Sequence, residues 1–225
     1  MRKTDGMTMK WKILGVVFFS LLLAATVLLV VLRAEAPFTP IKREERPHKA
    51  LLVLDLQKDF IGPEAKYPVD KSQVEPMLTA VNSVIEKAEQ LAIEVIYIDT
   101  QFKKDQWVTN WFRNYAAIEG TAGAAYDERL KVVSKRVFTK GKQDAFSNKK
   151  LDDYLRERAI GKLIVCGVFA DKCVSATARA AKNRGYEVTL LSDGIAAGSS
   201  TAIKRSIRYL KRKGVTITTS SDLLK

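Results

Sequence analysis

Histidine and cysteine are scarce in this chain of 225 residues: there is one histidine, His48, and there are two cysteines, Cys166 and Cys173. A single imidazole excludes any metal site that needs several histidines from one chain. Two cysteines do not make the disulfide framework of a small secreted domain, and Cys166 lies inside an apolar run. We therefore expect both cysteines to be free thiols.

Glycine, proline and acidic residues are also few. The chain has 12 Gly and 6 Pro beside 47% hydrophobic residues, which excludes a mainly disordered chain and indicates one ordinary domain plus an appendage. Its 38 Lys and Arg outnumber 25 Asp and Glu, for a formal net charge of +13. Nucleic acid is a usual partner of such charge, but zinc-finger spacing, RNA-binding aromatic signatures and a long basic arm are all lacking. We expect a solvated basic surface and no nucleic-acid partner.

One long apolar run stands near the N-terminus, after a short basic leader at 1–12. Residues 13–32 carry no charge, and as a helix they would measure about 30 Å, the thickness of a bilayer's hydrocarbon core. This predicts a transmembrane helix in contact with lipid and a single-pass membrane location. A cleaved signal peptide is the alternative, although its apolar region is normally only about 7 to 15 residues. Four basic residues flank the run on each side, so orientation stays open, with a preference for an extracytoplasmic domain.

The rest of the chain alternates apolar runs with stretches of helical spacing. Residues 33–48, with prolines among charges, are typical of an extended linker in which His48 is solvated, and residues 49–225 form the domain. The predicted strands are 50–54, 93–98, 132–138, 163–168, 187–191 and 215–218, and the predicted helices are 74–91, 149–159, 173–183 and 201–213. Strand alternating with helix predicts a three-layer α-β-α, doubly wound, Rossmann-like fold with a mostly parallel six-stranded sheet.

Cys173 lies where an apolar strand gives way to an Ala-rich helix. A thiol in the first turn of a helix lies beside unpaired N–H groups and the positive end of the helix dipole, which favour the thiolate. Such a sulfur would be a nucleophile, and the same N–H groups could hold an oxyanion. A buried cysteine also serves often as a small hydrophobe, so a structural role is the alternative.

Two further polar residues end apolar runs, Asp55 after 50–54 and Lys140 after 132–138. Each has an ordinary explanation, a turn cap for Asp55 and a solvated surface charge for Lys140. The carboxyl ends of parallel strands meet at one sheet edge, where ligands bind in doubly wound folds. There, a carboxylate could accept the proton of the Cys173 thiol while an ammonium stabilises the thiolate.

Three motifs around these residues resemble those of the isochorismatase-like cysteine hydrolase superfamily, over roughly residues 49–218. The stretch 55–60 (DLQKDF) is similar to the family's D-x-Q-x-D-F, and 140–146 (KGKQDAF) is similar to its K-x-x-x-S-A-F. The stretch 167–178 (GVFADKCVSATA) is similar to G-x-x-T-D-x-C-V-x-x-T-A. Two positions depart from the pattern, because Asp144 replaces the usual Ser and Ala170 the usual Thr.

The resemblance implies a catalytic triad of Asp55 as base, Lys140 and Cys173 as nucleophile. It also implies a non-proline cis peptide before Phe169 and an oxyanion hole made by the N–H groups of Phe169 and Cys173. Family members with this cysteine cleave C–N bonds through a thioester, which predicts an amidohydrolase. Metal-dependent nicotinamidases carry Asp-x-His after the second strand, but this chain has Asp99-Thr100-Gln101. We therefore expect no metal or other cofactor, and a linear amide, carbamoyl or ureido substrate rather than nicotinamide.

Three aromatic residues, Phe60, Trp107 and Trp111, are candidates for the wall of the substrate pocket, although aromatics in the long loop 100–123 also pack among themselves. A different function is open as well, that of a membrane-tethered binding module that kept the fold and lost the chemistry, since both departures lie beside the site. A homo-oligomer is left open.

Overall fold

The computed structural model describes residues 5–33, 38–42 and 46–223, and the chain divides into two units, 1–36 and 37–225. The first unit contains one helix, α1 (Asp5–Arg33). Residues 34–37 and 43–45 of the predicted linker lie outside the described residues, whereas Ile41 is buried and its N–H donates to the carbonyl of Arg184. His48 is the exposed first residue of a strand.

Helix α1 corrects the prediction made for 13–32. Across the described residues, no helix combines the length and the apolar character that crossing a membrane requires. The predictions of a transmembrane helix and of a single-pass membrane location are therefore wrong.

A six-stranded sheet forms the centre of the second unit, in the order β3-β2-β1-β4-β5-β6, and every neighbouring pair is parallel. Its strands are β1 (His48–Leu54), β2 (Glu94–Thr100), β3 (Val137–Lys140), β4 (Ile160–Val168), β5 (Glu187–Ala196) and β6 (Thr216–Thr218). The predicted doubly wound sheet is confirmed. The strand predicted at 132–138 begins only at Val137, so β3 is a short edge strand.

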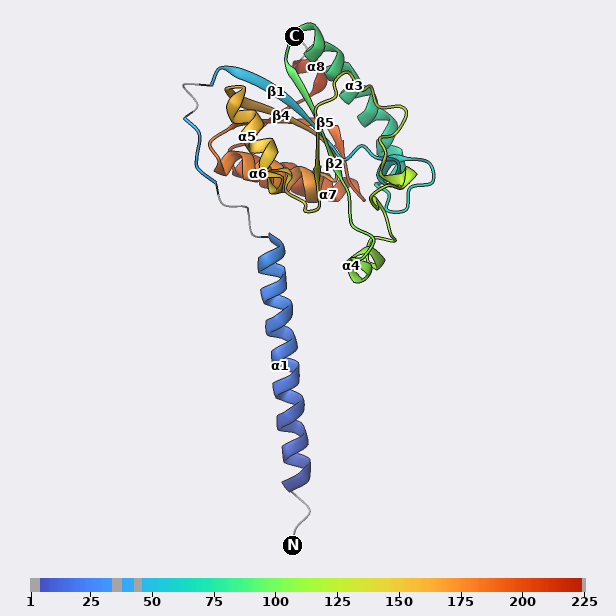
Figure 1. Cartoon of the computed structure of the whole chain (residues 1–225), viewed down its shortest axis with the longest axis vertical. Coiled ribbons are helices and arrows are strands. Elements are labelled where there is room, and N and C mark those ends of the chain that lie inside the picture. The colour runs from blue at the N-terminus through green and yellow to red at the C-terminus, as the bar shows by residue number, and fades with distance from the viewer. Residues whose placement is uncertain (1–4, 34–37, 43–45, 224–225) are drawn as a thin grey trace. The chain divides into compact units, whose positions relative to one another are not determined.

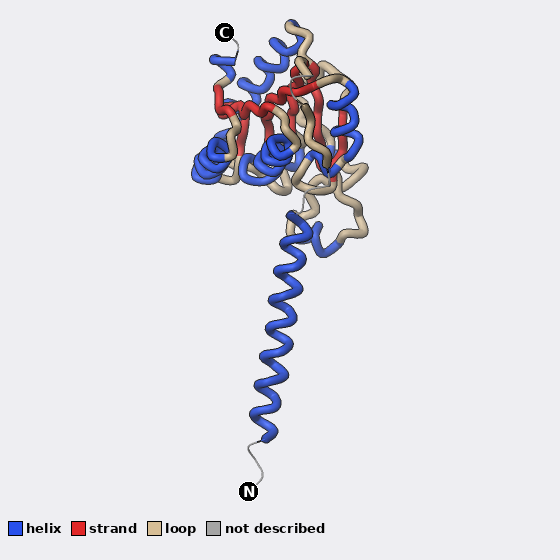
Figure 2. Tube along the Cα trace, turned by 90° about the vertical axis from the view of Figure 1, so that its left-hand side faces the viewer, coloured by secondary structure: helices blue, strands red, loops and turns tan. Residues whose placement is uncertain are grey.

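Helices cover both faces of the sheet (Figures 1 and 2). One layer holds α3 (Val74–Gln90) and α8 (Ser220–Leu223), and the other holds α5 (Lys149–Glu157), α6 (Ser175–Asn183) and α7 (Ser200–Arg212). In β1, Leu52 and Leu54 pack on the layer of α5–α7 and Leu51 and Val53 on that of α3, all fully buried. A strand apolar on both faces has to be covered twice, which explains the three layers.

Short elements fill the connections. They are α2 (Lys58–Ile61), α4 (Trp107–Trp111), the 3-10 turns η2 (Lys71–Gln73), η3 (Ala122–Ala124) and η4 (Ala145–Ser147), and the π-helical turn η5 (Ala170–Val174). The helix predicted from Cys173 thus begins earlier, with η5, and continues as α6.

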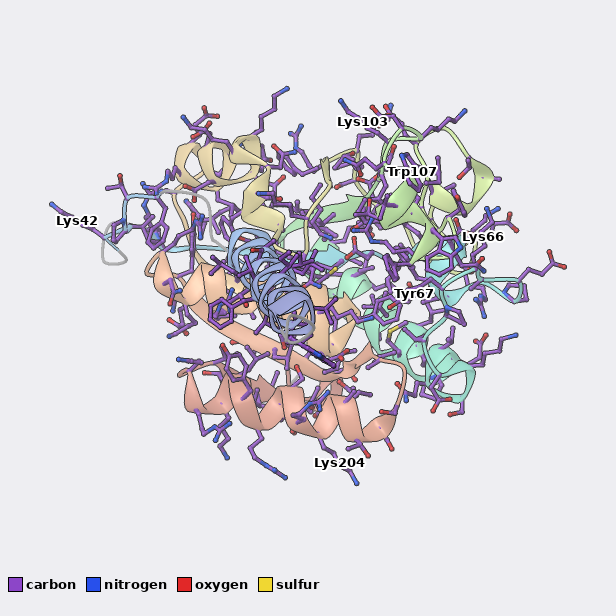
Figure 3. The ribbon with its side chains drawn as sticks, turned by 90° about the horizontal axis from the view of Figure 1, so that it is seen from below. Lys42, Lys66, Tyr67, Lys103, Trp107 and Lys204 are labelled. Atoms are coloured by element: carbon purple, nitrogen blue, oxygen red, sulfur yellow. The ribbon has the colours of Figure 1, made fainter. Side chains whose placement is uncertain are left out.

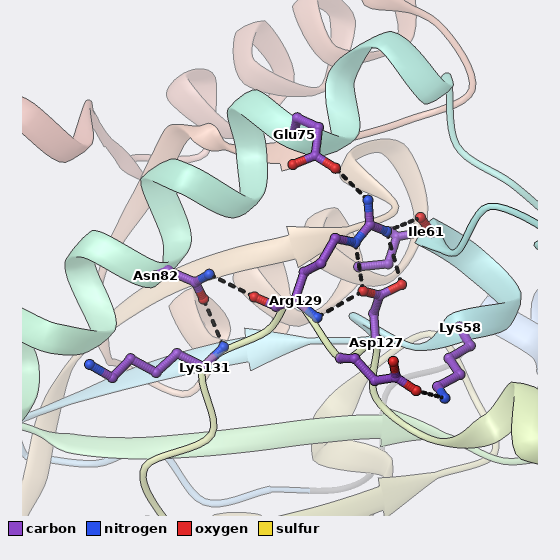
Figure 4. A network of polar contacts seen from close by, with 8 residues as sticks. Lys58, Ile61, Glu75, Asn82, Asp127, Arg129 and Lys131 are labelled. Carbon is purple, nitrogen blue, oxygen red and sulfur yellow. Dashed lines mark hydrogen bonds and ion pairs between the residues drawn. The ribbon is translucent and has the colours of Figure 1, made fainter.

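The connection between η3 and β3 is fastened by Arg129 (Figure 4). Its guanidinium donates to the buried carboxylate of Asp127, to Glu75 on α3 and to the carbonyl of Ile61, the last residue of α2. These hydrogen bonds hold the pKa of Asp127 below its usual value. Asn82 on α3 also bonds the carbonyl of Arg129. The connection is thereby fixed against α3.

The strand order switches direction between β1 and β4, and in doubly wound folds ligands bind at the carboxyl ends of the strands at such a switch point. Gly167 sits at this point with φ +114°, paired with Leu54, and a Cβ there would lie 2.0 Å from the Leu54 carbonyl oxygen. Only glycine allows this approach of the two strands.

We predict that Gly167→Ala destabilises the domain by more than about 2 kcal/mol, because it adds a backbone clash to an unfavourable φ. Gly198→Ala is the matched control, since its added Cβ would meet nothing within 4 Å. Thermal and denaturant unfolding of both variants checks this. Equal stability of the two variants would contradict it.

Candidate active site

Asp55, Lys140 and Cys173 come together at the carboxyl ends of the strands. Lys140 Nζ lies 2.9 Å from Asp55 Oδ2, and both side chains are almost completely buried. The charge of each of these two groups acts on the Cys173 thiol, Lys140 lowering its pKa and Asp55 raising it. The structure thus brings together three residues that lie far apart in the sequence, with 118 positions between the first, Asp55, and the last, Cys173.

The backbone at the end of β1 aims the carboxylate of Asp55. Asp55 has φ +57°, its N–H donates to the carbonyl of Ile98 on β2 and its carbonyl accepts from Gln57 N–H. Aspartate tolerates the left-handed region better than most residues, and non-glycine residues held there are concentrated at functional sites. The chain therefore turns sharply at Asp55 while staying tied to the neighbouring strand.

Thr100 completes the polar cluster and was not predicted. Its hydroxyl donates to Asp55 Oδ1 at 2.8 Å and accepts a hydrogen bond from Lys140 Nζ. Thr100 is the last residue of β2 and pairs with Lys140 at the end of β3. It comes two residues after the apolar run 93–98, just as Lys140 comes two residues after 132–138, so the signal that selected Lys140 could also have selected Thr100.

The other polar residues of 55–60 hold the loops around the site. The Gln57 side chain donates to the carbonyls of Thr100 and Ala124 and accepts from Thr100 N–H, all within 2.7–2.9 Å. Asp59 Oδ2 accepts from Ala117 N–H at 2.8 Å. The motif is therefore the carboxylate of Asp55 followed by two buried anchors that fix separate loop segments.

Cys173 lies in η5, directly after β4. The peptide bond between Val168 and Phe169 is cis, as the motif resemblance implied, and the carbonyl of Phe169 accepts from the N–H groups of Lys172 and Val174. The Ala170 carbonyl accepts from the hydroxyls of Ser175 and Ser206. The turn that carries the sulfur is thus fixed by its own backbone and by hydroxyls from α6 and α7. Assignment of the Phe169 and Cys173 N–H groups to an oxyanion hole stays a prediction.

The electrostatics of the thiol differ from the expectation of a stable thiolate. Cys173 is partly exposed as a residue, yet burial of its sulfur raises the pKa of the thiol to about 12, with Lys140 opposing and Asp55 adding to the rise. Burial by itself lowers the pKa of Lys140, but Asp55 and Cys173 outweigh it and raise that pKa. At neutral pH the site holds a protonated thiol and a charged ammonium.

Asp144 and Ala170, the two residues that differ from the family motifs, have local structural roles. Asp144 caps η4, since its Oδ1 accepts from Phe146 N–H at 2.9 Å, and Ala170 is completely buried in the core. Neither residue displaces a member of the Asp55, Lys140 and Cys173 cluster.

The aromatic candidates occupy different surroundings. Phe60 is buried against Phe169, with ring centroids 5.6 Å apart and an edge-to-face angle of 77°. Trp107 and Trp111, on α4, are 70% and 67% exposed. Figure 3 labels Trp107 on this loop, near Lys103. Assignment of all three residues to the substrate pocket stays a prediction.

Metal-ligand clusters are absent from the described part of the chain, where no three His, Cys, Asp or Glu side chains are grouped to hold an ion. At the end of β2, Asp99 Oδ2 accepts from the Gln101 side chain at 2.8 Å.

We expect the alkylation of Cys173 by iodoacetamide to be slow at pH 7 and to rise about tenfold per pH unit up to pH 10, because the raised pKa keeps the thiol protonated. Mass spectrometry of the labelled peptide measures it, and the Cys173→Ala protein reports any reaction at buried Cys166. A rate that is already constant below pH 7 would show a preformed thiolate instead.

Several known proteins resemble this chain in sequence and in fold. The model of the isochorismatase domain matches residues 49–222. Streptothricin hydrolase of Streptomyces noursei is 29% identical over 66% of this chain and 54% of its own length, so the chain spans about half of that relative. Ureidoacrylate amidohydrolase of Azorhizobium caulinodans is 23% identical over 71% of this chain and 81% of its own length.

A solved structure has the same fold. N-carbamoylsarcosine amidase from Thermoplasma acidophilum superposes with a TM-score of 0.66, at 23% identity, over 77% of this chain and 96% of its own. The family resemblance drawn from the three motifs and the prediction of a hydrolase acting on non-peptide C–N bonds are confirmed by these matches.

Proposed function

The chain belongs to the isochorismatase family, and we propose that it is an amidohydrolase that cleaves a C–N bond of a small amide, carbamoyl or ureido compound through Cys173, Asp55 and Lys140. The observation that carries this proposal is the buried Lys140–Asp55 pair, 2.9 Å apart, acting on one thiol. A buried ion pair adds little net stability over apolar residues of the same volume, so a chemical role accounts for it better than a structural one.

The protonation state of Cys173 before the reaction indicates the roles of Asp55 and Lys140. Because the Cys173 thiol holds its proton at neutral pH, the sulfur has to be activated during the reaction rather than before it. Asp55 is the base that takes this proton, and Lys140 stabilises the thiolate as its charge develops.

The reaction then has two halves. The sulfur attacks the substrate carbonyl, N–H groups of the η5 turn stabilise the oxyanion, and Asp55 returns the proton to the departing ammonia or amine. Water, deprotonated by Asp55, attacks the resulting thioester, and the sulfur leaves with its proton restored. The products are a carboxylic or carbamic acid and an amine, and no external electron acceptor is required.

An inactive binding module fits these observations less well. Such a module has no use for a charged lysine and a carboxylate buried beside a thiol, whose removal from water is costly. The departures at Asp144 and Ala170 leave the cluster in place, as described above.

We predict that Cys173→Ala lowers kcat by about a thousandfold or more, because the nucleophile is lost, and that Asp55→Asn and Lys140→Met each lower it by at least about a hundredfold. The measurement is ammonia release over a panel of small amides, ureas and carbamoyl compounds.

Lys142→Met is the matched control, because Lys142 lies two residues further along the chain and is exposed. It should keep the wild-type rate. Circular dichroism of each variant separates lost chemistry from lost folding. Wild-type turnover by a folded Cys173→Ala protein would rule out the assignment of the nucleophile.

A further inference from the structure

The hydroxyl of Thr100 connects the two charged side chains of the candidate site. It donates to Asp55 Oδ1 at 2.8 Å and accepts a hydrogen bond from Lys140 Nζ, which also donates to Asp55 Oδ2 at 2.9 Å. An ammonium can only donate and a carboxylate can only accept, so the direction of both hydroxyl bonds is fixed. The three side chains therefore form a closed ring of hydrogen bonds.

The ring is buried, so its members depend on one another for hydrogen bonds. Thr100 is 3% exposed, beside 1% for Asp55 and 2% for Lys140. At this depth a polar group that loses its partner is not compensated by bulk water. Each carboxylate oxygen of Asp55 accepts from a different member of the ring, and rotation of the carboxylate would break both bonds. Thr100 and Lys140 together therefore fix its orientation.

The side chain of Gln57 holds Thr100 from two sides. Gln57 Oε1 accepts from the Thr100 N–H at 2.8 Å, and Gln57 Nε2 donates to the Thr100 carbonyl at 2.9 Å. Gln57 is completely buried. The β-branched side chain of threonine has few rotamers, so a fixed backbone also restricts the position of the hydroxyl. Gln57 thereby places the hydroxyl, and the hydroxyl places the charged groups.

The position of Thr100 in the sheet explains why this residue connects the pair. β2 lies between β1 and β3, Asp55 follows β1, and Lys140 ends β3. Thr100 is the last residue of β2 and is in register with Lys140. A hydroxyl both donates and accepts through one atom, so it can bond a carboxylate on one side and an ammonium on the other.

We propose that Thr100 is a positioning residue whose hydroxyl orients the Asp55 carboxylate and holds the Lys140 ammonium where it stabilises the Cys173 thiolate. This inference rests on the proposed function and adds one residue to its machinery. Thr100 acts through Asp55 and Lys140 and transfers no proton itself, because its only hydrogen stays bonded toward Asp55.

The kinetic test separates the hydroxyl of Thr100 from its methyl group. On the panel compound that the wild type hydrolyses fastest, Thr100→Val should lower kcat about thirtyfold and leave KM within about twofold. Thr100→Ser keeps the hydroxyl and should retain at least about a third of the wild-type kcat. A threonine that serves only in packing would give the reverse order, because valine preserves its shape whereas serine leaves a cavity.

Thr139→Val is the matched control. Thr139 is the neighbour of Lys140 on β3 and is exposed, so its variant should keep the wild-type kcat. Melting temperatures of the three variants report whether each domain stays folded. A loss of kcat in Thr100→Ser as large as that in Thr100→Val would overturn the role of the hydroxyl.

Alkylation of Cys173 by iodoacetamide tests the inference apart from the proposed function, because it needs no substrate. At pH 9 it should be about fivefold slower in Thr100→Val than in the wild type, and within about twofold in Thr100→Ser. Without the hydroxyl, Lys140 loses an acceptor that holds it and Asp55 loses a donor that offsets its charge, and both changes disfavour the thiolate. General loosening of the site would instead expose the sulfur and speed the reaction.

The two measurements have separate consequences. Unchanged or faster alkylation in Thr100→Val would overturn the positioning role, as would a kcat within about threefold of the wild type. Absence of ammonia release from every compound, together with slower alkylation in Thr100→Val, would overturn only the hydrolase.

Discussion

The buried ion pair between Lys140 and Asp55 is the interaction on which the rest of the site depends. It connects the ends of β1 and β3 across β2, with the Thr100 hydroxyl bonded to both partners. Each charge compensates for the lost hydration of the other, so neither can be removed without leaving an uncompensated charge in the interior. The pair also prepares Cys173 for reaction. The ammonium favours the thiolate, and the carboxylate can accept the proton that the thiol must lose first.

The fold brings these groups together through topology rather than local sequence. A parallel sheet that winds outward from its centre in both directions places the ends of β1 and β4 side by side, and Gly167 lets them approach closely. Asp55 and η5 extend from these two strands, and Lys140 reaches the same point from the edge. One rigid sheet therefore fixes the carboxylate, the ammonium and the thiol, while the loops around the site complete its walls.

Much of this could be predicted from the sequence. Apolar runs mark the buried strands, and polar residues at their ends mark the site, because both follow from rules that act along the chain. Thr100 obeys the same rule. The raised pKa of Cys173 could not be predicted, because it depends on how tightly distant segments enclose the sulfur. The position of the loop 100–123 had no signal either, since the loop has no periodicity and is held by contacts with Asp59 and Lys66.

The N-terminal prediction failed for a different reason. A run of apolar residues gives a length and a hydropathy, but α1 does not reach the requirement for crossing a membrane within the described residues.

The location of Lys140 on β3 has a consequence for how the enzyme would lose activity. β3 is four residues long, lies at the border of the sheet and is bonded along one side only, to β2. Border strands of this length open locally at a lower free energy than the strands at the centre. Each such opening would withdraw the ammonium from the carboxylate while the core stays folded. Inactivation by heat would then begin as fraying of this border, ahead of global melting.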